Sequence, residues 1–168
     1  MSVFTPVTPE QLSAWLMRYR VGTLVQMQGI AAGIENTNYF VTTTGGSYVL
    51  TLFEKLIPSE LPFYLGLIAH LAQHGIPSPA PTTDLEGRLF SELNGKPAAL
   101  MSRLPGEAVT TATPAHCSEV GSTLADIHLA GQSYPGKFDN PRRVSRKGLI
   151  LGAASRHQRG PRGLSSLP

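Results

Sequence analysis

The sequence predicts an α+β fold, with five antiparallel strands in one sheet and a helix inserted after the third strand. Two strand-like stretches each contain a tight-turn signal, Gly45-Gly46 in the first and Asn94-Gly95 in the second, which predicts two hairpins. Three other segments carry apolar residues at helical spacing. These segments precede, separate and follow the hairpins, so the order is five strands with one helix inserted after the third.

The first helix has its own start signal. Thr8 offers a capping hydroxyl, Pro9 suits the first helical position, and Gln11 can return a hydrogen bond to the cap. One apolar face follows, at Leu12, Trp15, Leu16 and Tyr19. We expect this helix to end near Arg20 and residues 21–30 to form an irregular first strand.

Residues 33–55, GIENTNYFVTTTGGSYVLTLFEK, predict the second and third strands. A two-residue turn at Gly45-Gly46 would pair Thr43 with Tyr48, Val41 with Leu50 and Tyr39 with Leu52 on one face, and Thr42 with Val49 and Phe40 with Thr51 on the other. Both faces carry apolar groups. We therefore expect cover on both sides of these strands for at least part of their length.

The inserted helix is predicted to begin after Pro58-Ser59, with Gly75 placed for its C-terminal cap. Its apolar stripe comprises Leu61, Tyr64, Leu65, Ile68, Leu71 and Ala72. A proline-stiffened connection then leads to the second hairpin, residues 88–93 and 96–103. Asn-Gly is the strongest short-range signal for a type I′ turn, so the position of this hairpin follows directly from the sequence.

The third helix begins at Thr113-Pro114, after a strand break at Leu104-Pro105-Gly106, and Gly131 lies just past its predicted end. Its apolar face comprises Cys117, Val120, Leu124 and Ile127. We interpret Cys117 as a small core residue rather than a nucleophile. The histidines His70, His74 and His128 are interpreted as packing or solvated residues rather than catalytic ones.

Composition excludes several classes of protein. A hydrophobic content of 41% with 15% charged residues is ordinary for a globular chain, and the single cysteine excludes an internal disulfide. No basic segment followed by an apolar stretch begins the sequence, so nothing predicts export. The longest apolar run, residues 61–72, is too short to cross a bilayer. We expect a cytoplasmic protein with no membrane partner.

The net charge of +3 comes from the end of the chain. The 27 residues from Arg142 to Pro168 hold seven of the 14 Lys and Arg residues and none of the 11 acidic residues. The preceding part is therefore mildly acidic, and no nucleic-acid partner is expected. A basic RNA-binding tail is a minor alternative, because its arginines are not interleaved with aromatic residues.

Three segments carry a family resemblance: GIAAGIENTNYFVTTTGGSYVLTLFEK, ELPFYLGLIAHLAQHGIPSPAP and ELNGKPAALMSRLPGE. Together they resemble the bacterial homoserine kinases that are built on the aminoglycoside-phosphotransferase and choline-kinase fold, over roughly residues 1–142. The resemblance implies a protein-kinase-like small lobe followed by the start of a helical large lobe that is otherwise missing. It implies transfer of the γ-phosphate of ATP to the hydroxyl of L-homoserine, with Mg²⁺, in threonine biosynthesis. The implied partners are nucleotide and L-homoserine.

The resemblance also implies an organisation of the chain. Residues 1–103 would be the nucleotide-binding lobe, and residues 104–141 the hinge and the first helical part of the large lobe. Residues 142–168 would be a basic tail, disordered or read out of frame after a frameshift, with a short paralogue as the main alternative. We expect no catalytic residue and no metal ligand in this chain, because the family's H-x-D-x-x-x-x-N stretch does not occur in it.

A nucleotide site is implied at three places. Ala31, Ala32 and Gly33 would bring backbone amides close to phosphate, and Asn36, Thr37 and Asn38 would add polar groups to this lid. Thr51 stands where the family's third strand carries a Lys or Arg, so Glu60 is only a weak candidate for the partner of such a cation. Met101, Ser102, Arg103 and Leu104 would form the hinge at adenine.

Alternatives remain open at this stage. A small-residue loop before a hairpin, taken alone, is more often a plain turn than a nucleotide lid. Another small-molecule kinase of the same fold, acting on choline, methylthioribose or an aminoglycoside, would have similar residues in this lobe. A non-catalytic nucleotide-binding remnant is the third hypothesis.

Overall fold

The computed structural model describes residues 4–138. The chain divides into two units, Met1–Lys137 and Phe138–Pro168, and nearly all of the described residues belong to the first. The expectations for the basic tail, residues 142–168, fall outside the described residues. Within residues 4–138, none of the helices combines the length and the apolar content needed to cross a membrane.

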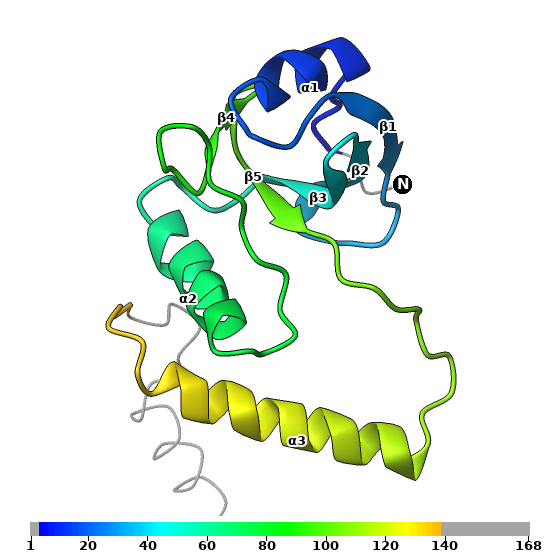
Figure 1. Ribbon diagram of the computed structural model, residues 1–168, viewed down its shortest axis with the longest axis vertical. Helices are drawn as coiled ribbons and strands as arrows, with labels where there is room; N and C mark the ends of the chain where they lie inside the picture. Colours follow the sequence, from blue (N-terminus) through cyan, green and yellow to red (C-terminus); the bar gives the residue numbers. More distant parts are fainter. Residues whose placement is uncertain (1–3, 139–168) are drawn as a thin grey trace, which may run out of the picture. The chain divides into compact units, whose positions relative to one another are not determined.

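The elements follow the predicted order (Figure 1). They are α1 (Pro9–Leu16), β1 (Leu24–Gly29), β2 (Asn36–Thr43), β3 (Gly46–Phe53), α2 (Leu61–Gln73), β4 (Ser91–Leu93), β5 (Lys96–Ser102) and α3 (Pro114–Gly131). The strands form one five-stranded sheet in the order β1-β2-β3-β5-β4, with every neighbouring pair antiparallel. The predicted α+β fold, with α2 inserted after the third strand, is confirmed.

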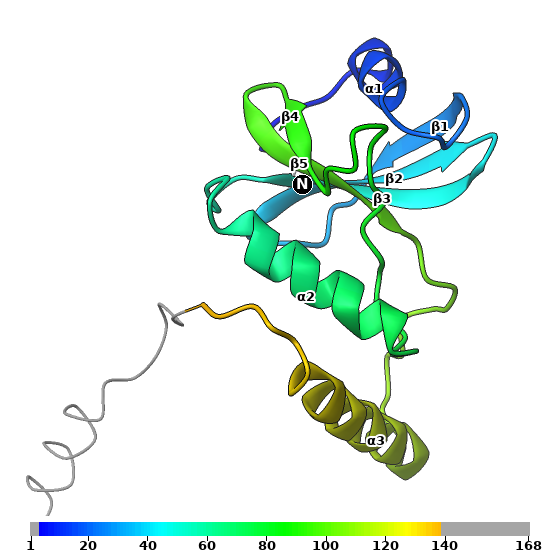
Figure 2. The same cartoon turned by 60° about the vertical axis from the view of Figure 1, so that its left-hand side comes forward.

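The two faces of the sheet have separate apolar cores, as the hairpin pattern predicted. On the face that we call outer, α1 packs on β2, β3 and β5 through Leu12, Trp15, Leu16, Tyr39, Val41, Leu50, Leu52, Ala98 and Leu100. On the inner face, α2 packs through Leu61 and Leu65 against Phe53, Ala99 and Met101. Figure 2 shows the two helices with the sheet between them. Strand alternation assigns every residue of β2 and β3 to one face or the other.

The first hairpin turns one residue earlier than predicted. Thr43 pairs with Gly46 and Val41 with Tyr48, so Thr44-Gly45 form the two-residue connection rather than Gly45-Gly46. The preceding segment sets this position: the Gly45 N–H donates to the Val21 carbonyl at 3.1 Å, and a Cβ on Gly45 would lie 2.6 Å from the same oxygen. The pairing shifts by two residues, which leaves the predicted faces unchanged.

Two element lengths also differ from expectation. α1 ends at Leu16, and a tighter turn continues to Tyr19, whose N–H donates to the Leu16 carbonyl at 2.9 Å. β4 begins only at Ser91, because the Asp84 carboxylate accepts hydrogen bonds from the Arg88 N–H and Nε, both at 2.8 Å. This side chain folds residues 84–88 into a turn that cannot join the sheet.

The second hairpin and the third helix start where predicted. Leu93 pairs with Lys96 across Asn94-Gly95, whose φ angles of 51° and 74° fit a type I′ turn. Thr113 caps α3, but Cys117 is exposed, so its interpretation as a core residue is wrong. His70 on α2 contacts the Ala130 carbonyl near the C-terminal end of α3, whereas residues 114–122, which include Cys117, are all exposed.

Candidate functional site

An apolar row crosses the inner face of the sheet. Phe40 pairs with Val49, and Val49 pairs with Met101, so these three side chains lie next to one another on β2, β3 and β5. Val49 packs with the α2 core, and Met101 also forms a bridge with Pro81. Phe40 and Val49 are only half-buried. The row therefore offers a flat apolar strip that a planar ring could cover.

A polar row lies beside the apolar one. The Thr51 hydroxyl donates to Asn38 Oδ1 at 2.8 Å, and Asn38 Nδ2 donates to the Asn36 carbonyl at 3.3 Å. The structure thus brings together three of the predicted site residues on the inner face. No ion pair with a Lys or Arg involves this row in the described part of the chain. Thr51, which stands where the family carries a Lys or Arg, thus contacts the neutral Asn38 side chain.

The loop between β1 and β2 lies over this polar row. It is closed at its base by the Ile30 N–H, which donates to the Asn38 carbonyl at 2.9 Å. Ala31, Ala32 and Gly33 are exposed. Gly33 has a φ of 140°, which residues other than glycine rarely adopt. A Cβ added to Gly33 would lie 3.4 Å from Asn38 Nδ2. The backbone of the loop and the Asn38 amide are therefore close neighbours.

Thr37 faces away from this site. Its side chain is fully buried on the outer face, where its hydroxyl donates to Glu54 Oε1 at 2.7 Å. The same hydroxyl accepts from the Phe4 N–H at 2.9 Å and from the Thr5 N–H at 3.1 Å. Alternation along β2 puts Thr37 and its neighbours Asn36 and Asn38 on opposite faces. We therefore leave the Thr37 side chain out of the nucleotide contacts.

The predicted hinge leaves few backbone groups for a ligand. The Ser102 N–H donates to the Ala80 carbonyl at 2.8 Å, and the Arg103 N–H donates to the Ser47 carbonyl at 3.2 Å. Within residues 4–138, the N–H of Leu104 makes no backbone hydrogen bond, and this residue is partly exposed. Among Ser102, Arg103 and Leu104, Leu104 is thus the residue whose N–H makes no backbone hydrogen bond within the described part of the chain.

Arg103 has a contact that the sequence did not reveal. Its guanidinium carbon lies 4.2 Å from the centre of the Phe40 ring, in a cation–π arrangement. The side chain of Arg103 therefore lies against the apolar row. Phe40 and Val49 were also missed as site residues, although the alternation of β2 and β3 had already put them on one face. The sequence did not show that Met101 lies beside them, because this depends on the pairing of β3 with β5.

The remaining candidates have structural contacts. The Glu60 carboxylate accepts from the Ile57 N–H at 3.1 Å, just before α2 begins. His70 Nε2 lies 3.0 Å from both the Ala130 carbonyl and Ser133 Oγ, which links α2 to α3. His74 Nδ1 lies 2.8 Å from the His70 carbonyl, and His128 is exposed. These contacts agree with the interpretation of the histidines as packing or solvated residues.

No metal centre is formed by the residues that the structure describes: none of their His, Cys, Asp and Glu side chains gather in a group of three that could hold an ion. The described residues therefore do not fit a resident Mg²⁺, and no chemical step is assigned to one.

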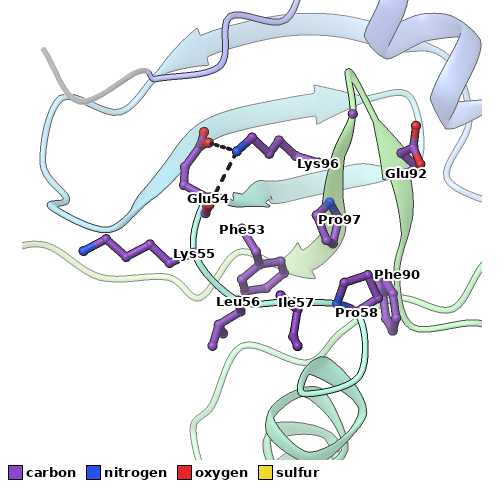
Figure 3. A pocket seen from close by; sticks show the side chains of 11 residues that line it. Phe53, Glu54, Lys55, Leu56, Ile57, Pro58, Phe90, Glu92, Lys96 and Pro97 are labelled. Carbon is purple, nitrogen blue, oxygen red and sulfur yellow. Dashed lines mark hydrogen bonds and ion pairs between the residues drawn. The ribbon is translucent and has the colours of Figure 1, made fainter.

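A pocket of about 430 Å³ lies at the C-terminal end of β3 (Figure 3). Its walls come from the β3–α2 loop and the β4–β5 hairpin, and none of the predicted site residues lines it. Lys96 Nζ lies 3.1 Å from Glu54 Oε2 at its edge. Burial alone would raise the pKa of Glu54, but hydrogen bonds from Thr37, Thr5 and Lys96 outweigh it and hold this pKa below its ordinary value.

Solved structures share this fold. The chain aligns with a spectinomycin phosphotransferase crystallised with ADP and spectinomycin, with a TM-score of 0.61, 19% identity and coverage of 96% of this chain and 50% of that one. It aligns with an amicoumacin kinase in complex with AMP-PNP and Ca²⁺, with a TM-score of 0.62, 18% identity and coverage of 90% and 54%. At these identities, the likeness shows the fold alone.

Sequence relatives are much more similar. The chain is 50% identical over 142 residues to the homoserine kinases of Burkholderia mallei and Burkholderia thailandensis. The match covers 84% of this chain but only 43% of the length of those relatives. A family model described as the phosphotransferase enzyme family matches residues 26–162, which extends past Arg142, where the resemblance was expected to stop. With well over half of its residues matched, the chain belongs to the phosphotransferase enzyme family.

Proposed function

We propose that this chain is the nucleotide-binding part of an ATP-dependent kinase that phosphorylates the side-chain hydroxyl of L-homoserine in the cytoplasm. The observation that carries this proposal is the 50% identity over 142 residues to homoserine kinases. In the same proposal, residues 1–103 are the nucleotide lobe and residues 104–141 are the hinge with the first helix of the second lobe. Threonine biosynthesis is the corresponding pathway.

The nucleotide would lie on the inner face of the sheet. Its adenine ring would cover the apolar row of Phe40, Val49 and Met101, with the Leu104 N–H as a donor to the ring edge. Arg103, stacked on Phe40, would border the same ring. An apolar strip beside a backbone donor suits a purine, because the ring has a large flat surface and few polar edge atoms.

The phosphates would lie under the loop between β1 and β2. Ala31, Ala32 and Gly33 carry no side chain larger than a methyl group, so backbone amides can approach an anion closely. The amides and hydroxyl of the polar row, from Asn36, Asn38 and Thr51, lie next to this loop. These groups are neutral, and we propose that the side-chain amides bind phosphate by hydrogen bonds in place of the usual Lys or Arg. The Thr51 hydroxyl, whose one donor is used on Asn38 Oδ1, would hold the Asn38 amide in position.

Catalysis is not assigned to any described residue. In phosphoryl transfer of this kind, a carboxylate accepts the proton of the attacking hydroxyl, and metal ions held by further acidic groups neutralise the developing charge. We therefore propose that the 168-residue chain binds nucleotide without turning over L-homoserine by itself. Mg²⁺ belongs to this proposal only as the ion that accompanies ATP.

The alternative acceptors are those of other kinases with this fold, and two of the solved structures are described as a spectinomycin phosphotransferase and an amicoumacin kinase. An aminoglycoside, choline or methylthioribose kinase would have the same nucleotide face, so this face cannot distinguish the acceptors. L-homoserine is the proposed acceptor because the homoserine kinases are 50% identical to this chain, whereas the spectinomycin phosphotransferase is 19% identical.

Isothermal titration of the 168-residue chain with AMP-PNP and Mg²⁺ tests the nucleotide part of the proposal. We expect saturable binding that falls at least about tenfold in Val49→Asp, because a carboxylate in the apolar row repels the phosphates and must be desolvated under the ring. Val25→Asp is the matched control, because Val25 lies on β1 with 64% of its surface exposed. Equal affinity in both variants, or no binding by the unmodified chain, would overturn the site.

A coupled assay for ADP release tests the acceptor. L-homoserine, choline, methylthioribose and an aminoglycoside are compared as substrates of the same chain. Release of ADP with L-homoserine alone would assign the whole reaction to these 168 residues and contradict the proposal of binding without turnover. Release of ADP with another acceptor would replace L-homoserine as the proposed substrate. We expect binding of nucleotide without release of ADP.

A further inference from the structure

The Thr37 hydroxyl connects the N-terminal segment to the sheet. It accepts hydrogen bonds from the Phe4 and Thr5 N–H groups, at 2.9 and 3.1 Å, and donates to Glu54 Oε1 at 2.7 Å. The side chain of Thr37 is fully buried. A single hydroxyl thus uses both acceptor sites and its one donor, so loss of this hydroxyl leaves several partly buried groups without partners.

The Glu54 carboxylate extends this connection to β5. Glu54 Oε2 accepts from Thr5 Oγ1 at 3.0 Å and lies 3.1 Å from Lys96 Nζ, which also donates to the Glu54 carbonyl at 3.4 Å (Figure 3). The Glu54 side chain is only 12% exposed. A charge buried to this degree depends on its partners, because its desolvation must be offset by hydrogen bonds and by the lysine.

Further contacts hold the rest of the N-terminal segment. The Val7 N–H donates to the Tyr39 hydroxyl at 3.0 Å, and Asn94 Nδ2 donates to the Pro6 carbonyl at 2.9 Å. Residues 4–7, which we call the strap, are therefore tied to β2, to the end of β3 and to the β4–β5 turn.

The strap and the phosphate loop meet on the two sides of one strand end. Thr37 lies between Asn36 and Asn38, and the Asn38 carbonyl accepts the Ile30 N–H that closes the loop at its base. A shift of the Thr37 backbone would therefore move the base of the loop as well. The polar side of that strand end faces the proposed phosphates, while the opposite side is fixed by Thr37, Glu54 and the strap.

We propose that Thr37 and Glu54 are positioning residues for phosphate binding: together with the strap they hold the start of β2, and through it the loop of residues 30–35, in the conformation that accepts the phosphates of a nucleotide. This inference rests on the proposed function for its ligand. Its structural part, that contacts on the outer face fix the loop, does not depend on the ligand and is tested by a separate measurement.

The competing explanation is a purely structural role, in which Thr37 contributes only to the stability of the fold. Thr43 provides a matched control. It lies on the same strand and the same face, it is also buried, and its hydroxyl donates to the Val21 carbonyl and accepts from the Gly45 N–H at 3.1 Å. Thr37→Val and Thr43→Val thus make the same chemical change at opposite ends of β2.

Amide hydrogen exchange of the ligand-free chain tests the structural part. We expect Thr37→Val to accelerate exchange at Ile30 and Asn38 by roughly three- to tenfold, because the loop base would open from its fixed conformation more often. Thr43→Val should leave these two amides unchanged, and Thr37→Ser, which keeps the hydroxyl, should restore slow exchange. Unchanged exchange in Thr37→Val, or equal acceleration in Thr43→Val, would overturn the inference.

Titration with AMP-PNP and with adenosine tests the functional part. We expect Thr37→Val to weaken AMP-PNP binding by about three- to tenfold and to leave adenosine binding unchanged, because only the phosphates contact the loop. Lys96→Met, a partly exposed position that is less demanding for folding, should shift the AMP-PNP affinity in the same direction by a smaller factor. Equal losses for both ligands would show a general structural effect and overturn the positioning role.

The two measurements separate the possible failures. If Thr37→Val accelerates exchange in the loop but the unmodified chain binds neither AMP-PNP nor adenosine, the proposed function fails and the positioning of a phosphate site fails with it. If the unmodified chain binds AMP-PNP and Thr37→Val binds it equally well, the proposed function stands and the positioning role is overturned.

Discussion

Two helices of this chain begin in the same way and end up in different environments. Both α1 and α3 have a threonine cap followed by proline, and in both a side chain three residues after the cap accepts the N–H of the cap residue. In α1 the Thr8 N–H donates to Gln11 Oε1 at 2.9 Å, and in α3 the Thr113 N–H donates to His116 Nδ1 at 3.2 Å. The local chemistry that starts the two helices is therefore equivalent.

Their packing is not equivalent. α1 has 8 residues and buries Leu12, Trp15 and Leu16, whereas α3 has 18 residues and buries none. On α3, Val120 and Leu124 are 67% and 50% exposed. A helix is stabilised mainly by burial of its apolar face, so the cap alone cannot give α3 the stability of α1. Where a helix begins and what covers it are thus separate properties of the sequence.

The largest difference between the two helices is expected when a leucine on each is replaced by alanine and the free energy of unfolding is compared. Leu12→Ala removes a fully buried side chain from the outer core and should lower the free energy of unfolding by about 2–5 kcal/mol. Leu124→Ala on α3 should change it by less than about 0.5 kcal/mol, because half of that side chain is already in contact with solvent. Urea unfolding, followed by the fluorescence of Trp15, gives both values.

Similar losses of unfolding free energy in the two variants would mean that the apolar face of α3 is buried to the same degree as that of α1. Leu12→Ile is a useful control, because it keeps the volume of the side chain and should cost much less than the alanine variant. Trp15 is the only tryptophan of the chain, so its signal reports the packing of α1 without interference.

Acid should loosen the α1 side of the sheet through Glu54. Burial opposes ionisation of this carboxyl, but hydrogen bonds from Thr37, Thr5 and Lys96 outweigh it and hold its pKa below the ordinary value of 4.5. A carboxyl whose pKa is lower in the folded than in the unfolded state stabilises the fold fully above about pH 4.5 and loses this contribution as the pH falls further. The strap that leads into α1 should be released over that range.

Glu54→Gln should make the stability of the chain less dependent on pH below about 4.5, with a lower plateau near neutrality. Asp84, whose pKa is also lowered by its bonds with Arg88 despite burial, still titrates in this variant, so part of the acid sensitivity should persist. Trp15 fluorescence and the free energy of unfolding from pH 3 to pH 7 provide the measurement. Identical curves for the variant and the unmodified chain would show that Glu54 does not couple α1 to the sheet.

Local signals predicted the parts of the fold that depend on a few neighbouring residues. Thr8 and Thr113 gave the starts of two helices, and Asn94-Gly95 gave the turn of the second hairpin. The first hairpin was placed one residue too late, because its turn is fixed by the Val21 carbonyl, more than twenty residues away. Contacts between distant segments leave no periodic pattern in a sequence, so this register could not be predicted from the turn residues alone.

The candidate site was predicted to a similar extent. The family resemblance implied Asn36, Asn38 and Thr51 as nucleotide-site residues, and the structure joins them by hydrogen bonds. Thr37 was grouped with its neighbours, although strand alternation alone could have separated them. Arg103 over Phe40 could not be foreseen, because their contact depends on how the end of β5 lies relative to β2 across an intervening strand.

The capping threonines should give the smallest difference between the two helices. Thr8→Ala should lower the free energy of unfolding by about 1 kcal/mol, because α1 forms part of the outer core and cannot fray without losing its apolar contacts. Thr113→Ala removes the same hydrogen bond but should change global unfolding by only a few tenths of a kcal/mol, and its effect should appear as faster amide exchange in the first turn of α3. Thr8→Ser and Thr113→Ser keep the capping hydroxyl and serve as controls. If Thr113→Ala lowered the global stability as much as Thr8→Ala, α3 would unfold together with the sheet, and the difference in exposure between the two helices would not measure their coupling to the core.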